Sequence, residues 1–165
     1  MDDLELANKV AWSMIGKPYV WGGDDPMAGF DCSGVIVEIL QSIGYLGRYD
    51  DLSAHGFFNK YHEMGRVWHP GEPDYRDGKS YSDVPPSTGC LVFWHANNEP
   101  GRVIHVEYCI DKTRSIGASG GGSKTKTIED AITQNACVKI RPFATRKNLL
   151  AFADVFRNSG AFNGR

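Results

Sequence analysis

The sequence lacks several features that would place it in other classes of protein. None of its four cysteines forms a Cys-x-x-Cys pair, which argues against a thioredoxin-like redox motif or a zinc ribbon. No apolar run approaches the roughly 20 residues that a membrane-spanning helix needs. The 18 Lys and Arg residues against 20 Asp and Glu leave a net charge of -2, without a broad basic field. We therefore expect no nucleic-acid partner and no membrane partner.

The beginning of the sequence also lacks a targeting segment. Met1-Asp2-Asp3 has neither the basic nor the apolar region of a signal peptide. We expect a chain that is made in the cytoplasm and carries no export signal of its own. Its 165 residues, 41% of them hydrophobic, suffice for one domain over residues 1–165.

Helical periodicity dominates the first part of the chain, and strand-like runs dominate the second. The predicted helices cover residues 3–16, 33–44, 53–64 and 128–136. The predicted strands cover residues 90–94, 103–110, a short run near 116, and 137–140. Residues 65–88 have the composition of an irregular surface loop, and 149–156 fit either a strand or a helix. This order predicts an α+β fold, with helices packed on an antiparallel sheet.

The four cysteines have two kinds of surroundings. Cys90, Cys109 and Cys137 lie in apolar, strand-like runs, where a free cysteine acts as a small buried hydrophobe. Cys32 stands at the start of a predicted helix, whose free N–H groups favour a thiolate and can also hold an oxyanion. Gly34 would let a substrate approach the backbone closely. The alternative is that Asp31 is an ordinary helix cap and Cys32 packs without a chemical role.

Of the five histidines, one has the setting of a catalytic base. His55, His62 and His69 recur every seven residues, but Gly65 and Pro70 break any helix that could align them on a metal, so we expect surface positions. We expect His95 to be exposed in a polar turn. His105 lies inside the apolar strand 103–108 and therefore needs a polar partner.

Four motifs, taken together, resemble those of the NlpC-type cell-wall cysteine peptidases. They are PYVWGG at 18–23, FDCSGV at 30–35, GCLVFW at 89–94 and HV at 105–106. The resemblance covers roughly residues 5–118 and implies a compact papain-like fold, with the nucleophile at a helix N-terminus. It implies no cofactor and no metal.

The resemblance also implies roles for individual residues. Cys32 would be the nucleophile and His105 the general base and then the general acid, with Tyr19 beside the thiolate assisting the oxyanion. Asp31 and Ser33 would help to hold the free amino group of the substrate's L-alanine, because an ammonium needs oxygen acceptors close to the reacting carbonyl. Trp21 is a further candidate for substrate binding.

The sequence departs from the family pattern at two positions. The family commonly has a third polar residue twelve positions after the base, where it orients the imidazole, but this sequence has Gly117 there. Period-two alternation makes Ser119 our candidate for the third residue and Glu107 the alternative, and a water or backbone carbonyl could also serve. Cys90 replaces the usual Asp of its strand, and we interpret it as packing.

The resemblance implies a cysteine endopeptidase that cuts peptidoglycan stem peptides through a thioester, between D-glutamate and diaminopimelate. Two alternatives stay open. One is a non-catalytic phage tail or wall-binding module that keeps the fold, and the other is a thiol amidase or acyltransferase with another substrate.

The segments 116–122 and 131–142 resemble the version of this domain found in bacteriophage particles and prophage regions. This narrower resemblance implies a virion-associated enzyme, or one that another apparatus delivers to the cell wall. It also implies phage tail proteins as partners besides the peptidoglycan.

Overall fold

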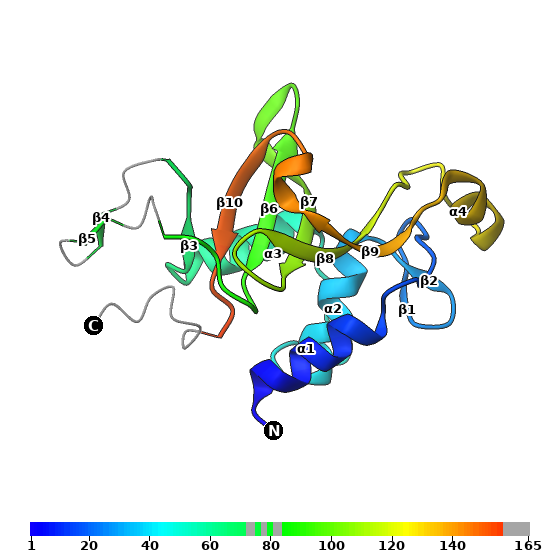
Figure 1. The fold of residues 1–165 in the computed structure, drawn as a ribbon, viewed down its shortest axis with the longest axis horizontal. Helices are drawn as coiled ribbons and strands as arrows, with labels where there is room; N and C mark the ends of the chain where they lie inside the picture. Colours follow the sequence, from blue (N-terminus) through cyan, green and yellow to red (C-terminus); the bar gives the residue numbers. More distant parts are fainter. Residues whose placement is uncertain (72–74, 77–78, 81–83, 157–165) are drawn as a thin grey trace. The chain divides into compact units, whose positions relative to one another are not determined.

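The computed structural model describes residues 1–71, 75–76, 79–80 and 84–156 (Figure 1). Its helices are α1 (Asp3–Ser13), α2 (Cys32–Ser42), α3 (Ala54–Glu63), α4 (Ile128–Gln134) and the 3-10 turn η1 (Phe143–Thr145). Its short strands are β1 (Asp24–Asp25), β2 (Gly29–Phe30), β3 (Val67–Trp68), β4 (Tyr75–Arg76) and β5 (Lys79–Ser80). Its longer strands are β6 (Leu91–Ala96), β7 (Glu99–Cys109), β8 (Arg114–Ser119), β9 (Cys137–Pro142) and β10 (Leu149–Ala153). Helices packed with an antiparallel sheet make this the predicted α+β, papain-like fold.

The chain divides into two compact units, which we describe separately. Unit 1 comprises Met1–Ser53 and Ile116–Arg141, and unit 2 comprises Ala54–Ser115 and Pro142–Arg165. The expectation of a single domain over residues 1–165 stays a prediction. In the part of the chain that the structure describes, every helix is too short or too polar to cross a bilayer.

Unit 1 is built around the packing of α1 against α2, which lie side by side in Figure 1. Asp2 and Glu5 form a capping box at the start of α1, because each side chain accepts a hydrogen bond from the other residue's backbone N–H. The helix buries Ala7 and Ala11 and ends at Ser13, three residues before the predicted end. α2 buries an almost continuous apolar surface, formed by Val35, Ile36, Val37, Ile39 and Leu40. Cys32, the candidate nucleophile, therefore stands at the N-terminus of a helix whose position is fixed by its buried apolar residues.

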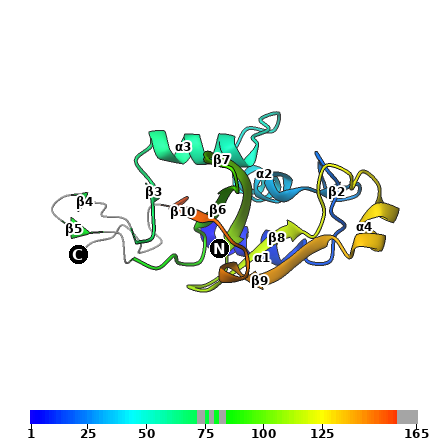
Figure 2. The same cartoon turned by 90° about the horizontal axis from the view of Figure 1, so that it is seen from above.

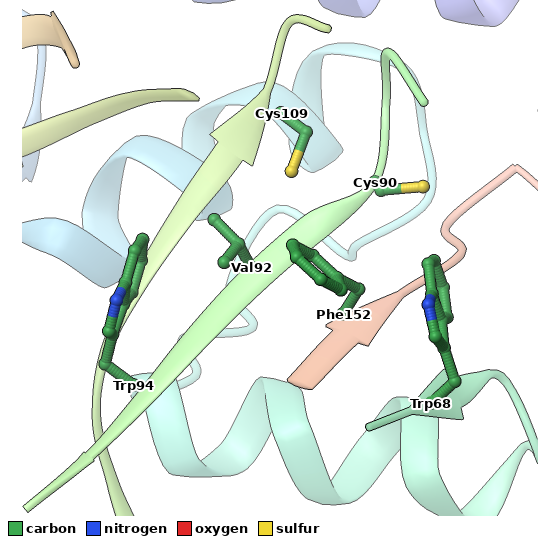
Figure 3. Packing of buried hydrophobic residues seen from close by; sticks show 6 residues of the cluster. All are labelled: Trp68, Cys90, Val92, Trp94, Cys109 and Phe152. Atoms are coloured by element: carbon green, nitrogen blue, oxygen red, sulfur yellow. The ribbon is translucent and has the colours of Figure 1, made fainter. Parts of the chain in front are cut away.

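Unit 2 contains the strands β3-β10-β6-β7, in that order and antiparallel. α3 packs on β7 and β10 along one face of this sheet (Figure 2), where Phe58 of the helix meets Phe93 of β6 edge to face. The opposite face carries a buried cluster of six side chains, which Figure 3 shows gathered over these strands: Trp68, Cys90, Val92, Trp94, Cys109 and Phe152.

The register of β6 and β7 places two polar residues on the face of this buried cluster. His105 pairs with Trp94 and Glu107 pairs with Val92. Residues directly opposite one another in an antiparallel pair point to the same side of the sheet. His105 and Glu107 therefore project from the face that carries the cluster, away from α3, and the sheet holds both in a fixed geometry.

Three details of the predicted elements were wrong. The segment 65–88 is not loop throughout, because β3 pairs with β10 and buries Trp68 in the core. β7 begins at Glu99, which pairs with Ala96, so the turn is shorter than expected. His95 is half-buried rather than exposed, and its Nδ1 lies 2.7 Å from the carbonyl oxygen of Ala96. The ambiguous segment 149–156 contains the strand β10. Within 65–88, residues 72–74, 77–78 and 81–83 lie outside the described residues.

Candidate active site

Cys32 is the first residue of α2, and Asp31 is the cap of that helix. One oxygen of the Asp31 carboxylate, Oδ1, accepts from the Gly34 N–H at 2.8 Å and from the Ser33 hydroxyl at 2.9 Å. The other, Oδ2, accepts from the Gly22 N–H at 3.1 Å. Cys32 is half-buried at the positive end of the helix, a place that favours its thiolate.

Glycine is required where the Gly-rich loop meets α2. A Cβ on Gly34 would lie 2.0 Å from the carbonyl oxygen of Gly23, and one on Gly23 would lie 2.4 Å from that of Gly29. The same Gly23 carbonyl accepts from the Asp31 N–H at 2.8 Å. The loop backbone therefore uses the room that the missing side chain of Gly34 leaves, and close approach of a substrate to the Gly34 backbone stays a prediction.

Tyr19 is buried in unit 1, with 4% of its surface exposed. Its N–H donates to the Ala136 carbonyl at 3.0 Å, and its backbone forms a bridge with Phe30. A Cβ on Gly121 would lie 2.3 Å from the tyrosine ring, so the glycine run that follows β8 packs closely on this ring. Trp21 lies two residues further on, and about half of its surface is exposed to solvent.

A hollow of about 160 Å³ lies beside the start of α2, entirely within unit 1. Its lining comes from the Gly-rich loop, the first turn of α2 and the segment before α3: Gly22, Gly23, Asp24, Asp31, Ser33, Gly34, Asp51 and Ser53. Three of these side chains are carboxylates, so the hollow has acceptors for a cationic group. Glu38 also lies on α2, and burial together with the charges of Asp25 and Asp24 raises its pKa.

Unit 2 contains a buried relay of three side chains. Nε2 of His105 lies 2.8 Å from Oε1 of Glu107, and the Ser115 hydroxyl donates to Oε2 of Glu107 at 2.6 Å. All three residues are buried, and 1% of the surface of Glu107 is exposed. The structure therefore brings His105 together with Glu107, the alternative third residue of the sequence analysis.

Aromatic packing holds the imidazole of His105. The ring of Trp94 lies against it, with the ring centroids 5.4 Å apart, and the guanidinium of Arg146 lies 5.6 Å from the centroid of the Trp94 ring. Trp94 is itself buried, so its position is fixed by the core. Neither Trp94 nor Ser115 was predicted from the sequence as part of the site. The cross-strand register with His105 could have indicated Trp94, whereas Ser115 carried no signal beyond being a serine next to an apolar strand.

Ser119, our first candidate for the third residue, is buried on the part of β8 that belongs to unit 1. Its role in orienting the base stays a prediction, as do the roles of Tyr19, Asp31, Ser33 and Trp21. The structure shows that Asp31 caps α2 and that the Ser33 hydroxyl donates to the same carboxylate. Because Ser33 donates its hydroxyl hydrogen to Asp31, its oxygen is oriented to accept from a cationic group.

The burial and hydrogen bonds of the other cysteines and histidines indicate structural roles. Cys90 and Cys109 are fully buried, and burial raises the pKa of the Cys109 thiol well above its ordinary value. Cys137 is half-buried, so the prediction that it is a buried hydrophobe was wrong in degree. Nδ1 of His55 accepts from the Val103 N–H at 3.2 Å, and Nδ1 of His69 lies 3.0 Å from the Leu150 carbonyl. Among the described residues, no group of three or more His, Cys, Asp or Glu side chains could hold a metal ion.

A model of the NlpC/P60 family matches residues 16–142, which is most of the chain and includes both Cys32 and His105. This protein belongs to the NlpC/P60 family. The match begins and ends later than the resemblance described from the motifs alone, so it also takes in α4 and β9.

Two curated relatives and one solved structure illustrate the similarity. The bifunctional muramidase/DL-endopeptidase CwlT of Bacillus subtilis is 26% identical over 122 residues, which cover 74% of this chain and 31% of the relative. The murein DD-endopeptidase MepH of Escherichia coli is 51% identical over 37 residues, covering 20% and 14%. The chain thus spans less than a third of the length of these relatives. An NLP/P60-family protein of Staphylococcus aureus, described as similar to a lipoprotein, has the same fold, with a TM-score of 0.60 and 19% identity over 94% of this chain and 42% of that one.

Proposed function

We propose that this NlpC/P60 protein is a cysteine endopeptidase that hydrolyses a peptide bond in peptidoglycan stem peptides. The observation that carries the proposal is the buried hydrogen bond between His105 and Glu107, in a chain whose family motif places Cys32 at the start of a helix. Relatives that are named as peptidoglycan endopeptidases support the substrate class. A module that only binds the wall would have no need of an oriented, buried imidazole, which favours the enzyme over the binding module.

The imidazole has the hydrogen-bonding arrangement of a general base. When Nε2 donates its hydrogen to the Glu107 carboxylate, the neutral ring has its lone pair on Nδ1. In the proposed first step, this nitrogen takes the proton of the Cys32 thiol, and the thiolate attacks the scissile carbonyl carbon. Glu107 stabilises the imidazolium that results and is therefore a positioning residue.

The rest of the reaction follows from this proton transfer. The new C–S bond makes a tetrahedral oxyanion, which the first N–H groups of α2 and the hydroxyl of Tyr19 stabilise. The intermediate collapses as the C–N bond breaks, and His105 returns its proton to the leaving amine. A water molecule, giving a proton to His105, then attacks the thioester carbonyl. The C–S bond breaks, and the Cys32 sulfur recovers the proton.

We propose that the acidic hollow beside α2 receives the free amino group of the stem peptide. Asp31 and Ser33 supply acceptors there, and Asp24 and Asp51 add negative charge to the lining. An ammonium in this place would lie close to the nucleophile, which fits a substrate whose N-terminal residue is near the scissile bond. We propose that the exposed indole of Trp21 packs on the apolar part of the same peptide.

Mass spectrometry of the products tests both the function and the bond. Purified peptidoglycan and a panel of muropeptides are incubated with the protein, and we expect cleavage between D-glutamate and diaminopimelate, the bond type that the name DL-endopeptidase indicates for CwlT. Cleavage at a D,D-bond, as in the name of MepH, would keep the endopeptidase and correct the bond. Thioester transfer to an added amine, without hydrolysis of any muropeptide, would favour the acyltransferase alternative. No product from any of these substrates would contradict the proposal.

We further propose that the protein is carried by a phage particle or encoded in a prophage, with tail proteins as partners. The support is the pattern of residues 116–122 and 131–142 in the sequence. Proteomic analysis of phage particles purified from the organism of origin checks this directly. Absence of the chain from particles that contain the tail proteins would contradict a virion-borne enzyme, and absence of phage genes next to its own gene would contradict a prophage origin.

A further inference from the structure

Ser115 is a buried hydroxyl with a defined direction. None of its surface is exposed, and it stands where β8 begins, at the boundary of unit 2. Its Oγ donates to Glu107 Oε2 at 2.6 Å, a short distance of the kind that charge-assisted O–H···O bonds show. The other oxygen of the same carboxylate, Oε1, faces Nε2 of His105 at 2.8 Å.

We infer that Ser115 is a positioning residue, which fixes through Glu107 the ring nitrogen of His105 that carries the proton. This inference rests on the proposed function, in which Nδ1 of His105 is the base. The hydroxyl donates to Oε2, so that oxygen acts as an acceptor. An ionised carboxylate accepts at both oxygens, which requires the hydrogen of the neutral imidazole to be on Nε2. The lone pair is then on Nδ1, where the mechanism needs it.

The surroundings of the relay explain why one hydroxyl matters. Glu107 lies on the sheet face that carries Val92, Trp94 and Cys109 of the buried cluster. A carboxylate on such a face is costly unless donors stabilise its charge. Removing the Ser115 hydroxyl destabilises the ionised form of Glu107 relative to its protonated form. A protonated Glu107 can donate to Nε2, which moves the imidazole hydrogen to Nδ1 and removes the base.

Among the described residues of unit 2, Cys109 and Arg146 are ionisable groups near the relay. Cys109 on β7 has a pKa that burial raises, so its thiol stays neutral when His105 titrates. Arg146 lies over the ring of Trp94, the same ring that contacts His105. The variants S115A and S115C keep both groups, so the influence of these groups on the imidazole is the same in every variant.

The test measures the proton position of His105 by nitrogen-detected NMR of the full chain, in wild type, S115A and S115C. Cysteine at 115 nearly preserves the volume of the side chain but is a weak donor. We expect Nε2–H in wild type, and a shift of the neutral ring toward Nδ1–H in both variants. The imidazolium should deprotonate at a lower pH in the variants, because a weakened Glu107 carboxylate stabilises it less.

In S115A and S115C we expect kcat to fall about 10-fold, with KM nearly unchanged. This is the effect expected from the loss of one charge-assisted hydrogen bond that supports the transition state. Thr88→Val is the matched control, because it removes a hydroxyl that donates to the Ile110 carbonyl in the same unit. It should leave the His105 spectrum unchanged. The inference would be overturned if the neutral His105 ring kept its hydrogen on Nε2 in S115A and S115C and titrated at the same pH as in wild type. The spectra do not depend on turnover, so they test Ser115 even where the proposed substrates are not cleaved.

Discussion

Substitution of Cys32 by alanine should abolish the release of peptide fragments from purified peptidoglycan. Cys90 and Cys109 cannot replace it, because both are fully buried in unit 2 and burial raises the pKa of Cys109. Without the nucleophile no thioester forms, and the rate falls to the uncatalysed background. Cys32→Ser should be nearly as inactive, because its hydroxyl is far more weakly acidic than a thiol.

The matched control for Cys32→Ala is Cys137→Ala. Both cysteines are half-buried, and Cys137 lies on β9, with no part in the proposed chemistry. The control variant should keep the wild-type rate of fragment release, and both variants should keep their circular dichroism spectra and melting temperatures close to those of wild type. Fragment release by folded Cys32→Ala at the wild-type rate would eliminate Cys32 as the nucleophile.

Glu107→Gln should lower kcat by a factor of about 10² to 10⁴, with a small change in KM. General base catalysis contributes rates of this order, and it needs both the correct tautomer and a stabilised imidazolium. Glutamine preserves the shape of the side chain but removes the charge that faces His105 at 2.8 Å. The amide can also rotate to present its NH₂ group to Nε2, which would place the imidazole hydrogen on Nδ1.

Ser119→Ala is the comparison that separates the two candidates for the third residue. If Glu107 orients the base, Ser119→Ala should cost far less activity than Glu107→Gln, measured as kcat on the same muropeptide. A variant of Ser119 with the larger loss would identify that serine as the orienting residue instead. Melting curves of both proteins show whether either loss reflects unfolding, because both side chains are buried.

The local physics of helices and strands allowed much of this fold to be predicted. The helix at Cys32 followed from a capping aspartate and apolar residues at helical spacing, and the strand at His105 followed from an apolar run with β-branched residues. Trp68 in β3 was missed because its strand has two residues and is paired with β10, some 80 positions later in the chain. Such a pairing has no local signal.

For the candidate site too, the sequence predicted some features and could not predict others. Strand alternation placed Glu107 on the same face as His105, and the structure joins them by a hydrogen bond. It could not rank Glu107 above Ser119, because that choice depends on side-chain directions. Gly34 was expected to let a substrate approach the backbone, and the structure shows that its missing side chain accommodates the Gly23 carbonyl. In the same way, Gly121 accommodates the ring of Tyr19. A sequence shows that a side chain is absent but does not show which neighbouring atoms use the room.

In the proposed mechanism, the oriented imidazole of His105 activates the thiol of Cys32. The most direct measurement is the rate of Cys32 alkylation by iodoacetamide against pH, followed by mass spectrometry of the modified peptide in wild type and His105→Ala. We predict rapid alkylation of wild type well below the ordinary thiol pKa of about 8.5, and a shift of the profile toward that value in His105→Ala. Identical profiles in the two proteins would contradict the account.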